Sequence, residues 1–283
     1  MRYWGPNILI DGTKKRTSLD NQPLTTVANT PEAAESYEIR AQNRLREVSQ
    51  NPAGKIVLDA FTGLSNSVTL RPLTQEASQS FGAQAEADRP LQAQNPGGSS
   101  STIWYDSMYL LSASLTVRDP DHHWHPDDIL FHECVHAIRQ ILGVWRQAPM
   151  PEWKDREEFY AVMMTNIYLS RAGRNADMRG DYSPAFRPLD PSLRFGNVAT
   201  DRSKPGQAFA SKYNFEIVSF RSDTAPVYFP IAQMPLGWNP LREYEVFWNA
   251  SHDYSPVLQL SVPSKSSDDG FIPLTGWGGW RPR

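Results

Sequence analysis

The sequence predicts an α+β fold. Patterns with the period or the caps of helices cover residues 30–50, 53–61, 126–142 and 151–170, and patterns typical of strands cover residues 7–12, 66–73 and 100–106. We expect a small mixed sheet beside these helices, in a single domain of 283 residues. The core of this domain should span about 30–185, followed by an irregular C-terminal extension over about 186–283.

The chain begins with a short strand and a long helix. The stretch "NILIDG" reads as a strand that ends in a turn at Gly12. Thr30 can cap the helix that follows, Pro31 suits its first position, and Glu32 lies in its first turn. The stretch "AGKIVLDAF" indicates a second, shorter helix.

Two later stretches, "NSVTLRPL" and "SSTIWYD", alternate as strands do. Residues 74–99 between them are rich in Gln, Ala, Ser and Gly, which predicts a long surface loop. The stretch "STIWYDS" should form the edge strand of the sheet. An extended peptide could add to that edge as a further strand.

The centre of the chain predicts two helices. Pro126 suits the first turn of one helix, which runs to Leu142 and stops at Gly143. The second helix should run from about Pro151 to Ser170. Beyond these helices the chain is rich in Pro, Gly and Trp, and the stretches "FEIVSF" and "APVYFP" read as short strands.

Composition argues against several classes of protein. The net charge of −3 and the pI of about 6.1 are unlike those of a general nucleic-acid binder. The single cysteine, Cys134, excludes an intrachain disulfide framework and a cysteine-based zinc site. No stretch is apolar enough to span a membrane, and the N-terminal apolar run is too short for a signal peptide. Export would therefore need a machine that uses no cleaved signal.

The stretch "DDILFHECVHAIRQ" places His132, Glu133 and His136 in the spacing H-E-x-x-H. Histidines four residues apart lie on one face of a helix, so both imidazoles can bind one Zn²⁺ ion. Glu133 would then act as general base towards the water that the metal activates. The alternative is a core helix with hydrogen-bonded histidines, but the apolar residues around the motif would bury these groups at a high energetic cost. We therefore predict a zinc site.

A catalytic zinc site needs a third protein ligand. The motif H-E-x-x-H-x-x-G-x-x-H would supply a third histidine, but Arg139 and Leu142 occupy its last two defined positions. The next helix begins with Glu157 and Glu158, and we prefer Glu158 because its face carries small residues that allow a close helix contact. Glu157 points about 100° away round the helix, which predicts that it faces Arg156 or solvent.

These residues are similar to those of a known family. "LFHECVHAIR" followed by "EEFYAVMMTNIYLSRAGR" resembles the secreted-effector zinc metallopeptidases of Gram-negative bacteria. That family includes type III effector proteases that clip host MAP kinases and peptidase toxins attached to type VI secretion spikes. The resemblance covers about residues 35–185 and implies a gluzincin-type zincin fold. It also implies that His132, His136 and Glu158 bind zinc and that Glu133 is catalytic.

The resemblance further implies a protein or peptide substrate, a secretion-machine spike or carrier protein as partner, and a target in a host cytosol or a rival cell's periplasm. Tyr182 lies where relatives carry a polar ring residue, and it would either stabilise the oxyanion or pack at a turn. Asn166 would either bond a ligand histidine or pack as a buried polar residue. A polar entrance loop or a second metal site would account for the cluster of His122, His123 and His125.

The predicted zinc site and the resemblance together imply a zinc-dependent endopeptidase, secreted as an effector or toxin, that hydrolyses a peptide bond. Two alternatives stay open. One is a zinc amidase that acts on peptidoglycan peptides. The other is a catalytically inactive zincin-fold module that serves for binding or delivery.

Overall fold

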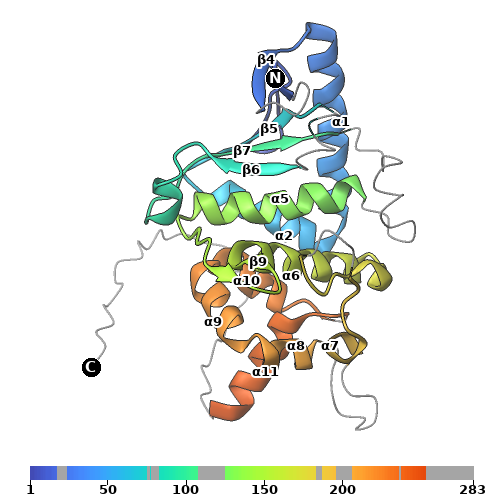
Figure 1. Ribbon diagram of the computed structural model, residues 1–283, viewed down its shortest axis with the longest axis vertical. Coiled ribbons are helices and arrows are strands. Elements are labelled where there is room, and N and C mark those ends of the chain that lie inside the picture. Colours follow the sequence, from blue (N-terminus) through green and yellow to red (C-terminus); the bar gives the residue numbers. More distant parts are fainter. Residues whose placement is uncertain are drawn as a thin grey trace, which may run out of the picture.

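The computed structural model describes residues 1–17, 24–74, 77, 83–107, 125–182, 187–195, 206–235 and 237–252. Over these residues the fold is α+β, as predicted. In Figure 1 a mixed sheet lies in the upper part of the molecule, two long helices cross the middle, and a group of shorter helices lies below them.

The main sheet has five strands in the order β1-β2-β5-β7-β6. The three inner strands run parallel, and both outer strands pair antiparallel with their neighbours. Their bounds are Arg2–Tyr3 (β1), Ile8–Ile10 (β2), Val68–Pro72 (β5), Ser101–Tyr105 (β7) and Gln84–Ala87 (β6). A separate hairpin pairs β3 (Lys14–Thr17) with β4 (Thr25–Ala28). The strands predicted in "NILIDG", "NSVTLRPL" and "SSTIWYD" are confirmed.

The predicted edge strand was wrong. β7 lies between β5 and β6, and the edge is formed by β6, inside the segment that we expected to be a loop. That segment also holds a 3₁₀ turn, η2, at Gln92–Gln94. The residues of β6, Gln-Ala-Glu-Ala, have little strand propensity of their own. This strand is stabilised by pairing with β7 and by packing on helix α5 (Pro126–Ile141). A local sequence pattern predicts neither contact.

The two N-terminal helices form where the sequence predicts them. Helix α1 covers Pro31–Gln50, and the hydroxyl of Thr30 accepts a hydrogen bond from the backbone N–H of Ala33 at 3.3 Å. Helix α2 follows at Pro52–Ala60, with the 3₁₀ turn η1 at Phe61–Gly63 after it. Both helices bury apolar residues in the main hydrophobic core of the molecule.

The two central helices, α5 and α6, pack side by side across the middle of the molecule (Figure 1). Helix α5 covers Pro126–Ile141, and Gly143, with φ of 74°, supplies the left-handed residue that ends it. Helix α6 covers Arg156–Arg171 and starts later than we predicted. The residues before it form two short paired strands, β8 (Pro149–Met150) and β9 (Lys154–Asp155).

The C-terminal segment is helical, so the strands predicted in "FEIVSF" and "APVYFP" were wrong. These stretches form α9 (Asn214–Asp223) and α10 (Ala225–Ala232). In α9 and its flanks the buried residues recur at helical spacing, namely Tyr213, Ile217, Phe220 and Thr224. The other short helices are η3 (Asn175–Asp177), α7 (Pro191–Phe195), α8 (Gln207–Lys212) and α11 (Pro240–His252). Buried residues of α8 to α11 join the same hydrophobic core as the central helices, while the predicted boundary near residue 185 stays a prediction.

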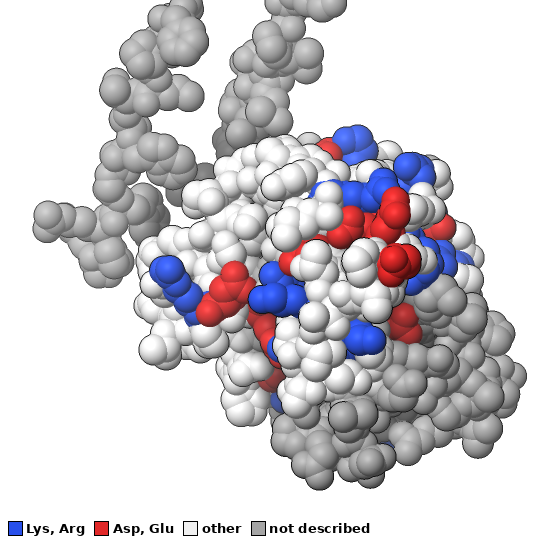
Figure 2. Space-filling view, turned by 90° about the horizontal axis from the view of Figure 1, so that it is seen from above, with Lys and Arg blue, Asp and Glu red and all other residues white. Residues whose placement is uncertain are grey.

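The surface carries both signs of charge. Figure 2 shows the molecule from above, and on that face acidic and basic side chains lie interspersed, with no continuous patch of one sign among the described residues. Of the helices described, none has both the length and the apolar character that crossing a membrane requires.

Candidate metal centre

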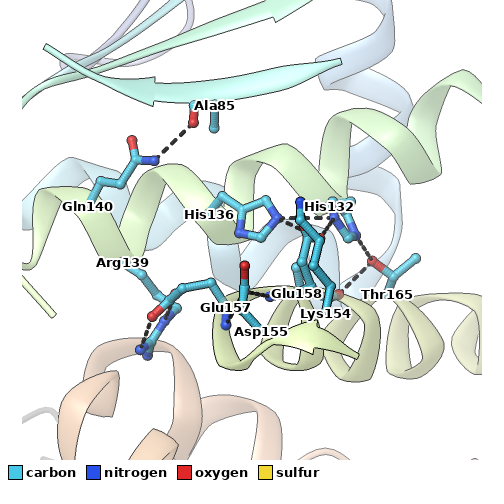
Figure 3. Close-up of polar contacts among 11 residues, drawn as sticks. Ala85, His132, His136, Arg139, Gln140, Lys154, Asp155, Glu157, Glu158 and Thr165 are labelled. Atoms are coloured by element: carbon cyan, nitrogen blue, oxygen red, sulfur yellow. Dashed lines mark hydrogen bonds and ion pairs between the residues drawn. The ribbon is translucent and has the colours of Figure 1, made fainter. Parts of the chain in front are cut away.

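Helix α5 presents two histidines to α6. His132 and His136 lie one turn apart, and both are buried, with 7% and 5% of their surface exposed. Their rings meet edge to face, with centroids 4.7 Å apart, and the indole of Trp145 also packs edge to face with the ring of His136. Helical spacing therefore brings both Nε2 atoms to one point between the helices, as Figure 3 shows.

Helix α6 brings Glu158 to the same point. Asp155 caps this helix, and its carboxylate accepts hydrogen bonds from the backbone N–H groups of Glu157 and Glu158 at 2.9 and 3.0 Å. Glu158 therefore lies in the first turn, where the positive end of the helix dipole favours a carboxylate. Its side chain extends from α6 towards the two histidines of α5 (Figure 3).

The three side chains converge closely. The Nε2 atoms of His132 and His136 are 3.1 Å apart, and Oε2 of Glu158 lies 3.3 and 3.4 Å from them. In a tetrahedral zinc site with bonds of about 2.0–2.1 Å, neighbouring ligand atoms lie roughly 3.3 Å apart. The three donors thus have the chemistry and the spacing of a zinc site, and the group could hold a metal ion.

A hydrogen bond at Nδ1 of His132 selects the tautomer of this side chain. Thr165 on α6 donates its hydroxyl proton to the carbonyl of Ala161 at 2.8 Å, so its oxygen is left as an acceptor for Nδ1–H of His132 at 3.4 Å. With the proton on Nδ1, the lone pair of Nε2 faces the other two donors. Nδ1 of His136 has no hydrogen-bond partner among the described residues.

Glu133 is a buried carboxylate beside this group. Burial raises its pKa, while the charges of His136 and His132 pull the pKa down and Glu158 adds to the rise. The backbone amide of Ala85, in the edge strand β6, lies close enough to lower the pKa of the Glu133 carboxyl. A carboxyl group with a raised pKa, close to a metal site, has the properties of a general base near neutral pH.

Tyr182 also reaches the site. Burial and the nearby carboxylates of Glu158 and Glu133 raise the pKa of its phenol, so the hydroxyl stays protonated and can donate. Its ring lies 5.3 Å from Nζ of Lys154, and both residues line a pocket of about 680 Å³. The predicted catalytic role of Tyr182 stays a prediction.

Glu157 differs from our expectation. It does not face Arg156 or solvent but forms a buried ion pair with Arg139 of α5, at 2.6 and 3.0 Å, and each side chain is 1% exposed. The guanidinium of Arg139 also donates to the hydroxyl of Thr224, between α9 and α10. The pair therefore ties both central helices to the C-terminal helices, and Glu157 is not free to bind a metal.

Asn166 does not bond a histidine. Its side-chain amide exchanges two hydrogen bonds with the backbone of Arg179, at 2.8 and 2.9 Å, three residues before Tyr182. It therefore anchors the segment that carries Tyr182. His125 precedes α5, and its backbone N–H donates to Asp128 at 3.1 Å. His122 and His123 lie outside the described residues, so the entrance loop and the second metal site stay predictions.

Metal binding should displace a proton from His136. Burial alone would lower its pKa, but the carboxylates of Glu158 and Glu133 outweigh burial and raise this pKa to about 9. The metal-free protein therefore holds this proton at pH 7, and we expect the release of about one proton per zinc ion. Calorimetry in buffers of different ionisation enthalpy measures that number. Release of no proton at pH 7 would contradict this charge distribution.

The same pKa sets how the stability of the metal-free protein depends on pH. A raised pKa means that protonated His136 stabilises the fold fully below its ordinary value of 6.5. This contribution is lost as the pH rises through about 9.

No protein-family model matches this sequence, and no curated protein matches it. The class of the protein therefore rests on its fold and its site. It is an α+β protein with a buried group of two histidines and one glutamate that could hold a metal ion.

Sequence reasoning missed several residues around this group. It noted Arg139 only as a departure from a longer motif, although Arg139 anchors α6. It did not consider Lys154, which donates to Glu158 at 3.2 Å; the spacing of four residues between them was the available signal. Gln140 was also missed, and its side chain holds the edge strand through the carbonyl of Ala85 at 2.9 Å (Figure 3).

Proposed function

We propose that this chain is a zinc-dependent endopeptidase with the zincin arrangement. The observation that carries the proposal is the mutual spacing of the three donor atoms, 3.1 to 3.4 Å, beside the buried carboxylate of Glu133. Two histidines and a glutamate, with a further glutamate that is not a ligand, form the set that hydrolytic zinc enzymes use. A merely structural zinc site would not need that fourth residue.

The residues divide the chemistry between them. His132, His136 and Glu158 would bind zinc, which supplies Lewis acidity towards a water molecule and a peptide carbonyl. Glu133 accepts the proton that the attacking water loses and passes it to the amine of the leaving group. Tyr182 donates a hydrogen bond to the oxygen that becomes negative when the carbonyl is attacked.

The edge strand supports a peptide as the substrate. β6 is at the edge of the sheet, and the backbone N–H of Ala85 in this strand reaches Glu133. An extended peptide that adds to this edge as a strand would bring its backbone amides to the general base. Backbone pairing of this kind favours an unfolded segment of a protein over a small amide.

The family resemblance extends the proposal to the biological setting. We propose a secreted bacterial effector or toxin that reaches a host cytosol or a rival cell's periplasm. The resemblance of the two central helices to effector metallopeptidases supports this setting.

Incubation of the zinc-loaded protein with a library of peptides from a digested proteome tests the proposed activity. We expect new peptide termini in the mass spectrum, their loss after treatment with a chelator, and their return when zinc is restored. Cleavage of cell-wall peptides with none of the library would favour the amidase. No cleavage of either substrate by a zinc-loaded protein would favour a binding module.

A further inference from the structure

Lys154 is the one non-glycine residue with a positive φ, 69°, among the residues that the structure describes. The backbone N–H of Asp155 donates to the carbonyl of Trp153 at 2.8 Å, which closes a three-residue turn centred on Lys154. A turn of this kind with a positive central φ is rare and strained for an L-residue. Glycine would adopt it without that cost, so the turn alone does not explain a lysine here.

The same turn removes a hydrogen bond that the Glu158 carboxylate would otherwise accept at the start of α6. Asp155 and Glu158 have the spacing of a capping box, in which the later carboxylate would accept the backbone N–H of the capping residue. That N–H is instead taken by the carbonyl of Trp153. The carboxylate of Glu158 is therefore free of the helix end and can extend to the histidines.

The two oxygens of Glu158 have different partners. Oε2 faces the Nε2 atoms of His132 and His136, and Oε1 accepts a hydrogen bond from Nζ of Lys154 at 3.2 Å (Figure 3). Tyr182 is the other donor near this carboxylate. Its proposed role towards substrate would turn the hydroxyl away, so Lys154 is the donor that remains throughout.

We propose that Lys154 is a positioning residue, which holds the outer oxygen of Glu158 so that a single carboxylate oxygen faces the two histidines. A carboxylate held in this way binds a metal through one oxygen and leaves a coordination position for water, as a hydrolytic site requires. The strained turn keeps the lysine directly over the first turn of α6. This inference rests on the proposed zinc site, and it adds the residue that sets how Glu158 binds.

Three substitutions test the inference. Lys154→Met removes the ammonium group, Lys154→Arg keeps a cation, and Lys154→Gly removes the group while it relieves the turn. The control is Lys55→Met, because Lys55 is an exposed lysine that pairs with Asp59 at the same spacing of four residues, away from the site. Zinc affinity is measured by competition with a chromophoric chelator, and the cobalt-substituted proteins give visible spectra that report the coordination number.

We expect Lys154→Met and Lys154→Gly to weaken zinc binding by about tenfold and to alter the cobalt spectrum. Lys154→Arg should keep the zinc affinity within about threefold of the parent, a smaller loss than the one expected when the hydrogen bond to Glu158 is removed. Lys154→Gly should not lower the melting temperature of the metal-free protein, because glycine suits the turn. Weaker binding without lost stability separates a positioning role from a structural one.

A parent protein that binds zinc, together with a Lys154→Met variant of equal affinity and spectrum, would overturn this inference alone. The inference would also be overturned if zinc binding weakened only in variants whose metal-free form has a lower melting temperature. A parent that binds no zinc would overturn the proposed function as well.

Discussion

Substitution of Glu133 by glutamine should reduce the rate of peptide cleavage by about 10²–10⁴-fold, the usual contribution of a general base. Glutamine keeps the size of the side chain but cannot accept the proton of the attacking water. Because Glu133 is not one of the three converging donors, zinc content should stay that of the parent. The initial rates of both proteins on one peptide from the digested-proteome library measure the effect.

The matched control for this substitution is Glu47→Gln, an exposed glutamate on α1 that pairs with Arg44. It should cleave the same peptide at the parental rate. If Glu133→Gln loses its zinc together with its activity, Glu133 contributes to metal binding. If that variant keeps full activity, the proposed mechanism is wrong.

Substitution of Arg139 by methionine should lower the free energy of unfolding by about 3–5 kcal/mol. Arg139 and Glu157 are buried together, and without the guanidinium the Glu157 carboxylate would remain in the protein interior with its charge uncompensated. The variant would also lose the hydrogen bond to Thr224 that ties α5 to the C-terminal helices. Urea unfolding of the metal-free proteins measures the change.

An exposed ion pair provides the comparison. The side chains of Arg44 and Glu47 are 32% and 45% exposed. Arg44→Met breaks this pair and should lower the free energy of unfolding by less than about 1 kcal/mol. The double variant Arg139→Met, Glu157→Met should recover part of the loss, because it leaves no unpaired buried charge. If Arg139→Met and Arg44→Met lower the free energy of unfolding by the same amount, the buried pair does not stabilise the fold more than the exposed pair does.

The parts of the site that the sequence predicts are those with local signals. His132 and His136 share a helix, so their spacing alone predicts that their rings converge. The helix that carries Glu158 was predicted with a start near Pro151, several residues before its start at Arg156, and Glu158 was preferred over Glu157 because its face carries small residues. The strands "NSVTLRPL" and "SSTIWYD" were likewise predicted from their own alternation.

The parts that the sequence does not predict depend on distant contacts. β6 has a polar sequence and forms because β7 pairs with it, so no local pattern marks it as a strand. The apolar run "FEIVSF" is short enough to fit either a helix or a strand, and packing against the core decides for the helix. The partner of Glu157 lies on another helix, and the positive φ of Lys154 contradicts the preference of its residue type.

The central claim is that His132, His136 and Glu158 bind one zinc ion. Metal content by elemental mass spectrometry tests it most directly, on the parent, on Glu158→Gln and on the surface control Glu47→Gln. Glu157 is unsuitable as a control, because its loss would leave Arg139 unpaired in the core. We expect about one zinc ion per chain in the parent and the control, and a large loss in Glu158→Gln. A folded parent that binds no zinc after resupply, or a Glu158→Gln variant that keeps it, would contradict the claim.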